Sequence, residues 1–117
     1  MSARADQLAA ALGEARGPGR KAFRRAGRIL GDRALRVVGQ ETLRLLAAGG
    51  LTTLDGTRPR TPGGVFLRLV REAATDAERR RIFGPGAGPV TVYQTTEAFR
   101  ARVRMSITRG TETEVPA

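Results

Sequence analysis

The hydrophobic positions of this chain recur at steps of three and four residues over most of its length, which is the period of the α-helix. The stripe is narrowest and most regular at Val65, Phe66, Leu69, Val70 and Ala73. Thr61 precedes this stripe as an N-cap, and Pro62 stands where a first helical residue is favoured. The pattern therefore predicts a helix that begins at Pro62.

Helical periods also run through the first half of the chain. Residues 3 to 15 are rich in alanine and predict a short helix. Residues 20 to 38 continue the period, as one helix or as two helices that divide at Gly31. We expect Gly39 to end this segment in a left-handed conformation and residues 40 to 48 to form a further helix.

Local start and stop signals organise the second half. Thr75 and Glu78 are spaced as a capping box, which predicts the start of another helix, and Gly84 follows as its end. Residues 51 to 61 contain β-branched residues and the turn pair Asp55-Gly56. These features favour a small hairpin and an irregular extended loop equally.

The fold class that we predict is mainly α, a small helical domain with a short hairpin or extended loop before the Thr-Pro-Gly-Gly helix. The glycines and prolines between residues 84 and 89 indicate a boundary. We accordingly divide the chain into an N-terminal helix and linker (1–19), a compact domain (20–84) and a C-terminal extension (85–117).

Within the extension, the alternation of residues 90 to 93 is typical of a short strand. Thr95 or Thr96 can cap a last helix that carries Phe99, Val103 and Ile107. About the last ten residues offer nothing to bury, and we expect them to be disordered.

Composition excludes several kinds of chemistry. The 117 residues include no Cys, no His and no Trp, which removes thiol nucleophiles, disulfides, zinc sites built on thiolate or imidazole, and the usual general base near neutral pH. We recognise no catalytic residue, no metal site, no cofactor site and no small-molecule substrate. No apolar run approaches the ~20 residues of a membrane span, so we expect a cytoplasmic protein that does not contact membranes.

Charge points to a polyanionic partner. The chain has 21 basic and 11 acidic residues, a net charge of +10, and 20 of the basic residues are arginine. A prokaryotic, GC-rich codon usage explains the preference for arginine over lysine but not the shortage of acids. Excess positive charge on this scale is most often used to bind nucleic acid.

Two basic elements, at residues 20 to 28 and 58 to 68, are candidates for that contact, and we expect both to face one basic groove. Lys21, Arg24, Arg25 and Arg28 recur at helical spacing and would form a ridge along one helix face, unless they are only a solvated surface. The second element comprises Arg58, Arg60, Thr61, Gly63, Gly64 and Arg68. Two glycines in a first helical turn would let a phosphate approach the backbone N–H groups, or would let the helix pack closely on another.

The run Arg58-Pro59-Arg60-Thr61-Pro62-Gly63-Gly64-Val65-Phe66-Leu67, with Gly49-Gly50-Leu51 before it and Arg81-Ile82-Phe83 after it, resembles the RNA-binding domain of the PHAX family, the phosphorylated adaptors for RNA export. The resemblance covers about residues 33 to 83. It implies a small helical domain that binds single-stranded RNA with limited sequence preference. By residue-to-residue correspondence, it assigns Arg58, Arg60, Thr61, Gly63 and Gly64 to the RNA surface.

This chain departs from the family at Pro59, where a basic residue is more usual, and it lacks the long acidic and phosphorylatable regions, so a role in RNA export is not implied. Two alternatives remain. One is a DNA-binding protein of the nucleoid type. The other is a ribonucleoprotein-associated module whose residues 90 to 107 dock on a protein partner. Among the aromatic residues, Tyr93 alone is a candidate for stacking on a base.

Overall fold

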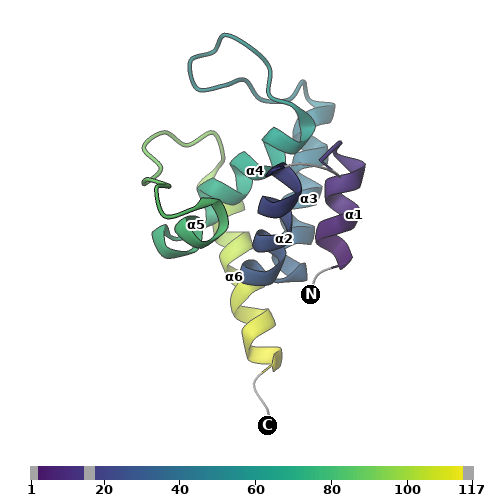
Figure 1. Ribbon diagram of the computed structural model, residues 1–117, viewed down its shortest axis with the longest axis vertical. Coiled ribbons are helices and arrows are strands. Elements are labelled where there is room, and N and C mark those ends of the chain that lie inside the picture. Colours follow the sequence, from purple (N-terminus) through teal and green to yellow (C-terminus); the bar gives the residue numbers. More distant parts are fainter. Residues whose placement is uncertain (1–2, 15–17, 115–117) are drawn as a thin grey trace.

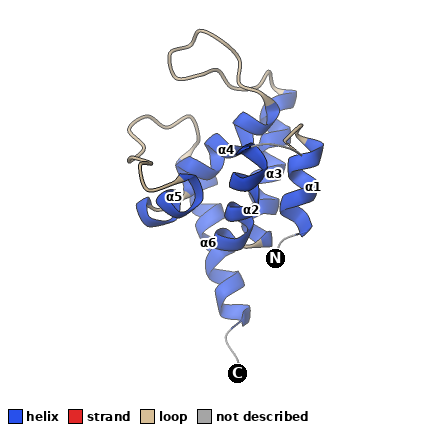
Figure 2. Cartoon of the chain, in the orientation of Figure 1, coloured by secondary structure: helices blue, strands red, loops and turns tan. Residues whose placement is uncertain are grey.

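The protein is seen here in a computed structural model that describes residues 3–14 and 18–114. Within these residues the chain forms helices α1 (Ala3–Ala11), α2 (Pro18–Leu30), α3 (Asp32–Ala47), α4 (Pro62–Ala73), α5 (Asp76–Phe83) and α6 (Glu97–Glu114) (Figure 1). The described residues hold no β-strand (Figure 2). The predicted mainly α class is therefore confirmed. None of the described helices is long and apolar enough to cross a membrane.

Helices α1, α2 and α3 pack against one another, α4 packs on α2 and α3, and α6 packs on α3 and α4 (Figure 1). A single residue, Gly31, separates α2 from α3 and has a φ of +89°, which a glycine adopts without strain. Residues 20 to 38 thus form parts of two helices rather than one. The two helices divide at Gly31, as the second of the two predicted alternatives has it.

The prediction that Gly39 ends a helix is wrong. Helix α3 runs without interruption to Ala47, and Gly39 is buried in its middle. A Cβ on Gly39 would lie 3.1 Å from Leu8 Cδ2, so the glycine lets α1 pack closely on α3. The helix ends instead at Ala47, and the Ala48 C-cap is followed by Gly49 and Gly50, which both have positive φ.

Between α3 and α4 the chain forms a loop that folds back on itself. Thr52 and Pro59 form an isolated antiparallel bridge, and Thr53 N–H donates to Arg58 O at 2.9 Å. Asp55 accepts hydrogen bonds from the Thr53 hydroxyl and from the N–H and hydroxyl of Thr57. These bonds lower the pKa of Asp55 from 3.8 to about 2. The loop is thus closed by local hydrogen bonds, without strands on either side.

The starts of α4 and α5 follow the sequence signals. The Thr61 hydroxyl accepts from Gly64 N–H at 3.0 Å with Pro62 as the first helical residue. At α5, Thr75 and Glu78 exchange the reciprocal bonds of a capping box. Both predicted starts are confirmed because each depends on residues within one turn of the helix.

One core joins all parts of the chain. Phe23 of α2 and Phe66 of α4 stack with ring centroids 4.4 Å apart. The same core contains Ala5 of α1 and Phe99 and Val103 of α6. Side chains from each of the three predicted segments, 1–19, 20–84 and 85–117, are therefore buried together; the division into those segments stays a prediction.

The region after residue 84 differs from expectation in two places. Residues 90 to 93 lie in an irregular loop rather than a strand. Helix α6 continues to Glu114, so the backbone of residues 108–114 is helical where disorder was expected, and residues 115–117 lie outside the described residues. Thr96 caps α6 by accepting a hydrogen bond from Phe99 N–H at 3.1 Å.

Candidate nucleic-acid interface

A hollow of about 290 Å³ opens where the loop before α4 meets the first turn of that helix. Its lining residues are Thr53, Arg58, Pro59, Arg60, Thr61 and Gly64. Arg58 is exposed and Arg60 is half-buried. The structure thus brings together four of the predicted site residues, Arg58, Arg60, Thr61 and Gly64, on one small surface.

Arg60 is held in place rather than free to rotate. Its Nε donates to Thr52 O at 3.0 Å, and the Gln94 side chain donates to the same carbonyl at 3.1 Å. Burial, helped by the positive charge of Arg68, lowers the pKa of Arg60, while Glu72 opposes the shift. The guanidinium remains a cation with fixed orientation, and an anion beside it would relieve the repulsion from Arg68.

The first turn of α4 differs from the predicted phosphate site. Gly64 N–H is used by the Thr61 cap, and Val65 N–H donates to Thr61 O at 2.9 Å. Pro62 has no N–H. The side chain of Glu14 fills the space beside Gly63, where a Cβ would lie 2.5 Å from Glu14 Oε1.

Glu14 also lies against the start of α2, since a Cβ on Gly19 would lie 2.7 Å from Glu14 Cδ. The glycines at the starts of α2 and α4 therefore both leave room for the Glu14 carboxylate, whereas the sequence suggested a close approach only at Gly63 and Gly64. Gly63 and the backbone of α4 are thus used in packing. Sequence alone does not show this because Glu14 is 49 residues away from Gly63.

Arg68, the last residue of the second predicted basic element, is turned inward. Its side chain is 9% exposed, and its Nε donates to Glu72 Oε2 at 2.7 Å. Its Nη2 donates to Val92 O at 2.6 Å. Arg68 thus joins α4 to the loop before α6, and its contribution to a ligand would be through its charge.

Glu72 is the residue that sequence reasoning missed. Its side chain is fully buried and accepts hydrogen bonds from Arg68, from Gln94 N–H, and from the N–H and hydroxyl of Thr95. A signal was present, because Glu72 follows Val65 by seven residues and Leu69 by three and so falls on the apolar stripe of α4. A carboxylate on such a stripe indicates a buried partner.

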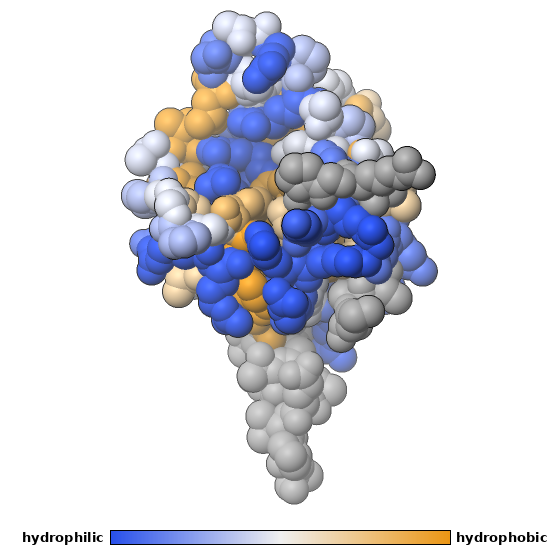
Figure 3. Space-filling model, in the orientation of Figure 1, coloured by the Kyte–Doolittle hydropathy of each residue, from blue (hydrophilic) through white to orange (hydrophobic). Residues whose placement is uncertain are grey.

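The predicted ridge on α2 exists in part. Lys21, Arg24 and Arg28 are exposed, and hydrophilic side chains cover much of this face in Figure 3. Arg24 Nε donates to Asp6 Oδ1 at 2.9 Å, which lowers the pKa of Asp6. Arg25 is half-buried and donates to Ile82 O at 3.4 Å, linking α2 to α5. Two of the four cations are therefore engaged within the chain.

No residue of α2 lines the hollow before α4. Helices α2 and α4 meet around Glu14 at their first turns and again at the stacked rings of Phe23 and Phe66. The prediction that both face a single groove stays a prediction.

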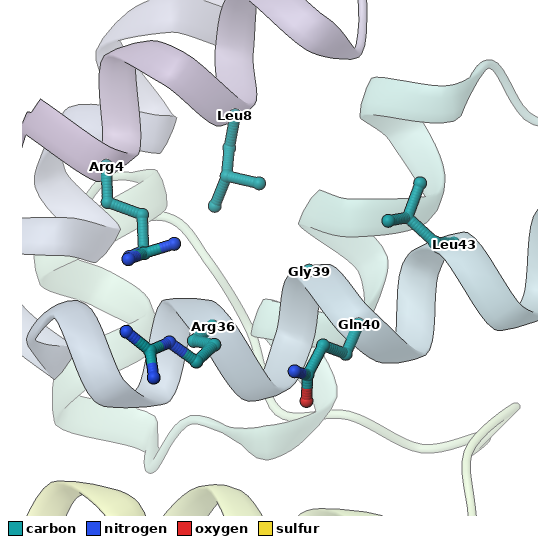
Figure 4. A pocket seen from close by; sticks show the side chains of 6 residues that line it. All are labelled: Arg4, Leu8, Arg36, Gly39, Gln40 and Leu43. Carbon is teal, nitrogen blue, oxygen red and sulfur yellow. The ribbon is translucent and has the colours of Figure 1, made fainter.

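A second hollow, of about 430 Å³, lies between α1 and α3 (Figure 4). Arg4 and Leu8 enter it from α1, and Arg36, Gly39, Gln40 and Leu43 line it from α3. Sequence reasoning gave no sign of it, because it depends on the close packing of Leu8 on Gly39. Within the described residues no three His, Cys, Asp or Glu side chains are grouped so as to hold a metal ion.

One of the two alternatives has residues 90 to 107, several of which are apolar, dock on a protein partner. Two of these, Phe99 and Val103, are instead buried within the chain. Arg104 of α6 also pairs with Glu78 of α5 at 2.6 Å. Much of the apolar surface of α6 is thus used by the protein's own core.

Comparison with known proteins gives one family. Residues 4–86 match the family model described as "Phosphorylated adapter RNA export protein, RNA-binding domain". The mouse (Mus musculus) phosphorylated adapter RNA export protein is 37% identical over 76 residues, which are 65% of this chain and 19% of the mouse protein. The matched segment is therefore about a fifth of that relative's length. No solved structure matches the chain.

Proposed function

We propose that this chain, which belongs to the family of the RNA-binding domain of phosphorylated adapter RNA export proteins, binds single-stranded RNA at the hollow before α4. The observation that carries the proposal is the pair Arg58 and Arg60 at the rim of that hollow, inside the matched segment. Each can neutralise one phosphate and release its condensed counterions.

The shape of the surface favours a single strand over a duplex. The hollow is small, about 290 Å³, and lies between a loop and one helical turn. The major groove of an A-form duplex is also too deep and narrow for side chains to reach its bases. Guanidinium contacts with phosphates carry no sequence information, so we expect limited sequence preference.

The test is fluorescence anisotropy with labelled single-stranded RNA, single-stranded DNA and duplexes of each, between about 50 and 200 mM salt. We expect single-stranded RNA to bind most tightly, with a log-log salt slope of about −3 to −4 for ~5 contacted phosphates. Preference for duplex DNA would favour the nucleoid alternative. The absence of any binding would overturn the proposal.

A variant pair separates local contact from net charge. Arg58→Ala with Arg60→Ala should weaken binding roughly tenfold or more and flatten the salt slope by about 1.4, since each single-strand phosphate contributes ~0.7. The control is Arg33→Ala with Arg44→Ala, which removes the same charge from exposed positions on α3. Equal losses in the two variants would show that charge alone is responsible.

A further inference from the structure

Tyr93 is an aromatic residue that the core does not use. It lies in the loop between α5 and α6 and is 50% exposed. The Arg100 guanidinium lies over the ring, with Cζ 4.1 Å from its centroid. Arg100 is itself fixed by Nη1, which donates to Thr95 O at 2.6 Å and to the Thr95 hydroxyl at 3.0 Å. One side of the ring is therefore supported while much of the residue faces solvent.

The loop that carries Tyr93 is tied to the hollow before α4. On one side of Tyr93, Val92 O accepts from Arg68. On the other, Gln94 N–H donates to the buried carboxylate of Glu72, and the Gln94 side chain donates to Thr52 O. Thr52 O also accepts from Arg60 Nε, so Gln94 and Arg60 meet on one carbonyl oxygen. The ring of Tyr93 is thus one residue away from Gln94, which contacts the loop before α4 that carries Arg58 and Arg60.

The other aromatic residues do not offer the same surface. Phe23, Phe66 and Phe99 are fully or almost fully buried. Phe83 is partly buried in the core, and Arg71 covers its ring at 4.3 Å. Burial and the charges of Arg68, Arg79 and Arg60 lower the pKa of Arg71.

We propose that Tyr93, supported by Arg100, is a stacking platform for one unpaired base of the strand whose phosphates contact Arg58 and Arg60. This inference rests on the proposed function and extends the RNA surface beyond residue 86, where the family match ends. A base stacked on a tyrosine ring gains binding energy whatever its identity, because every base has a π face. The fixed ring loses little freedom on binding, which favours the contact.

Tyr93 provides its own spectroscopic signal. The chain has one tyrosine and no tryptophan, so its tyrosine emission reports Tyr93 alone. Titration with unlabelled single-stranded RNA of about ten nucleotides should quench this emission as a base stacks on the ring. A ribose-phosphate strand of the same length without bases should bind through its phosphates and leave the emission unchanged.

Affinity measurements complete the test. Tyr93→Ala should weaken RNA binding by about five- to thirtyfold and leave the salt slope unchanged, because stacking involves no phosphate. Tyr93→Phe should bind within about twofold of the unsubstituted protein. Met105→Ala, on an exposed residue of α6, is the control and should have no effect. Thermal melting of each variant checks that the fold is retained.

The outcomes distinguish the two proposals. RNA binding without quenching, or with unchanged affinity in Tyr93→Ala, would overturn the stacking platform and leave the proposed function standing. Failure of the unsubstituted protein to bind single-stranded RNA at all would overturn both.

Discussion

Glu72→Gln is the most informative single substitution in this fold. The carboxylate is fully buried, and every group that contacts it is a donor, namely Arg68 Nε, Gln94 N–H, and the N–H and hydroxyl of Thr95. Glutamine has the same shape, but its amide nitrogen would face these donors and find no acceptor. The substitution therefore breaks a buried ion pair and leaves N–H groups unsatisfied without creating a cavity.

The expected loss of stability follows from these contacts. Removing one partner of a buried ion pair costs about 3 to 5 kcal/mol, and glutamine retains one acceptor oxygen, so we expect about 3 kcal/mol. A domain of this length has an unfolding entropy of about 250 cal/mol/K. The thermal midpoint should therefore fall by about 12 °C.

The assay is thermal unfolding followed by far-UV circular dichroism, with Glu41→Gln as the control. Glu41 pairs with Arg44 at 2.7 Å, and the Arg44 side chain is 63% exposed, so solvent screens this pair and it contributes little to stability. The control midpoint should fall by less than about 4 °C. If Glu72→Gln melts no lower than the control, the buried carboxylate of Glu72 does not hold the loop before α6 in place.

Two further predictions concern the first turn of α4 and the loop that precedes this helix. Gly63→Ala should stabilise the protein by up to about 1 kcal/mol when Glu14→Ala is also present, but by clearly less alone, because the new Cβ displaces the Glu14 side chain. A double-mutant cycle measured by chemical denaturation gives the coupling, and additive effects of the two substitutions on the free energy of unfolding would contradict the contact. The pKa of Asp55 lies below its ordinary value of 3.8, so its hydrogen bonds stabilise the loop above pH ~3.8, and this contribution is lost as the pH falls through about 2. An NMR titration of the carboxyl group should show that midpoint, and Thr57→Ala should move it upward.

The sequence predicts best what depends on neighbouring residues. Thr61 with Pro62, and Thr75 with Glu78, determine the starts of α4 and α5 through bonds that span three residues. The glycine at position 31 separates two helices for an equally local reason, its positive φ. Such signals do not require knowledge of the tertiary structure.

The errors arise where a distant residue decides the outcome. A glycine such as Gly39 is typical of a helix end, but here the absence of a side chain lets Leu8 of α1 pack closely on α3. A glycine in a first helical turn, such as Gly63, is typical of a phosphate site, but the side chain of Glu14 fills the space beside it. The close approach expected at Gly63 is present, whereas the role predicted for Gly39, a helix end, is wrong. In both cases the neighbour that decides the role of the glycine is distant in the sequence.

The hydrogen bonds of Glu72 extend beyond the residues that the family model matches. Glu72 lies inside the matched residues 4–86, but Gln94 and Thr95, which satisfy most of its carboxylate, lie outside them. A chain that ended at residue 86 would leave this buried group with Arg68 alone, and would also lose the part of the core that Phe99 and Val103 provide. The glycine- and proline-rich run that suggests a boundary in the sequence therefore connects two parts of one packed unit. Because the loop before α6 also carries Tyr93, RNA binding by this protein has to be measured on a chain that retains α6.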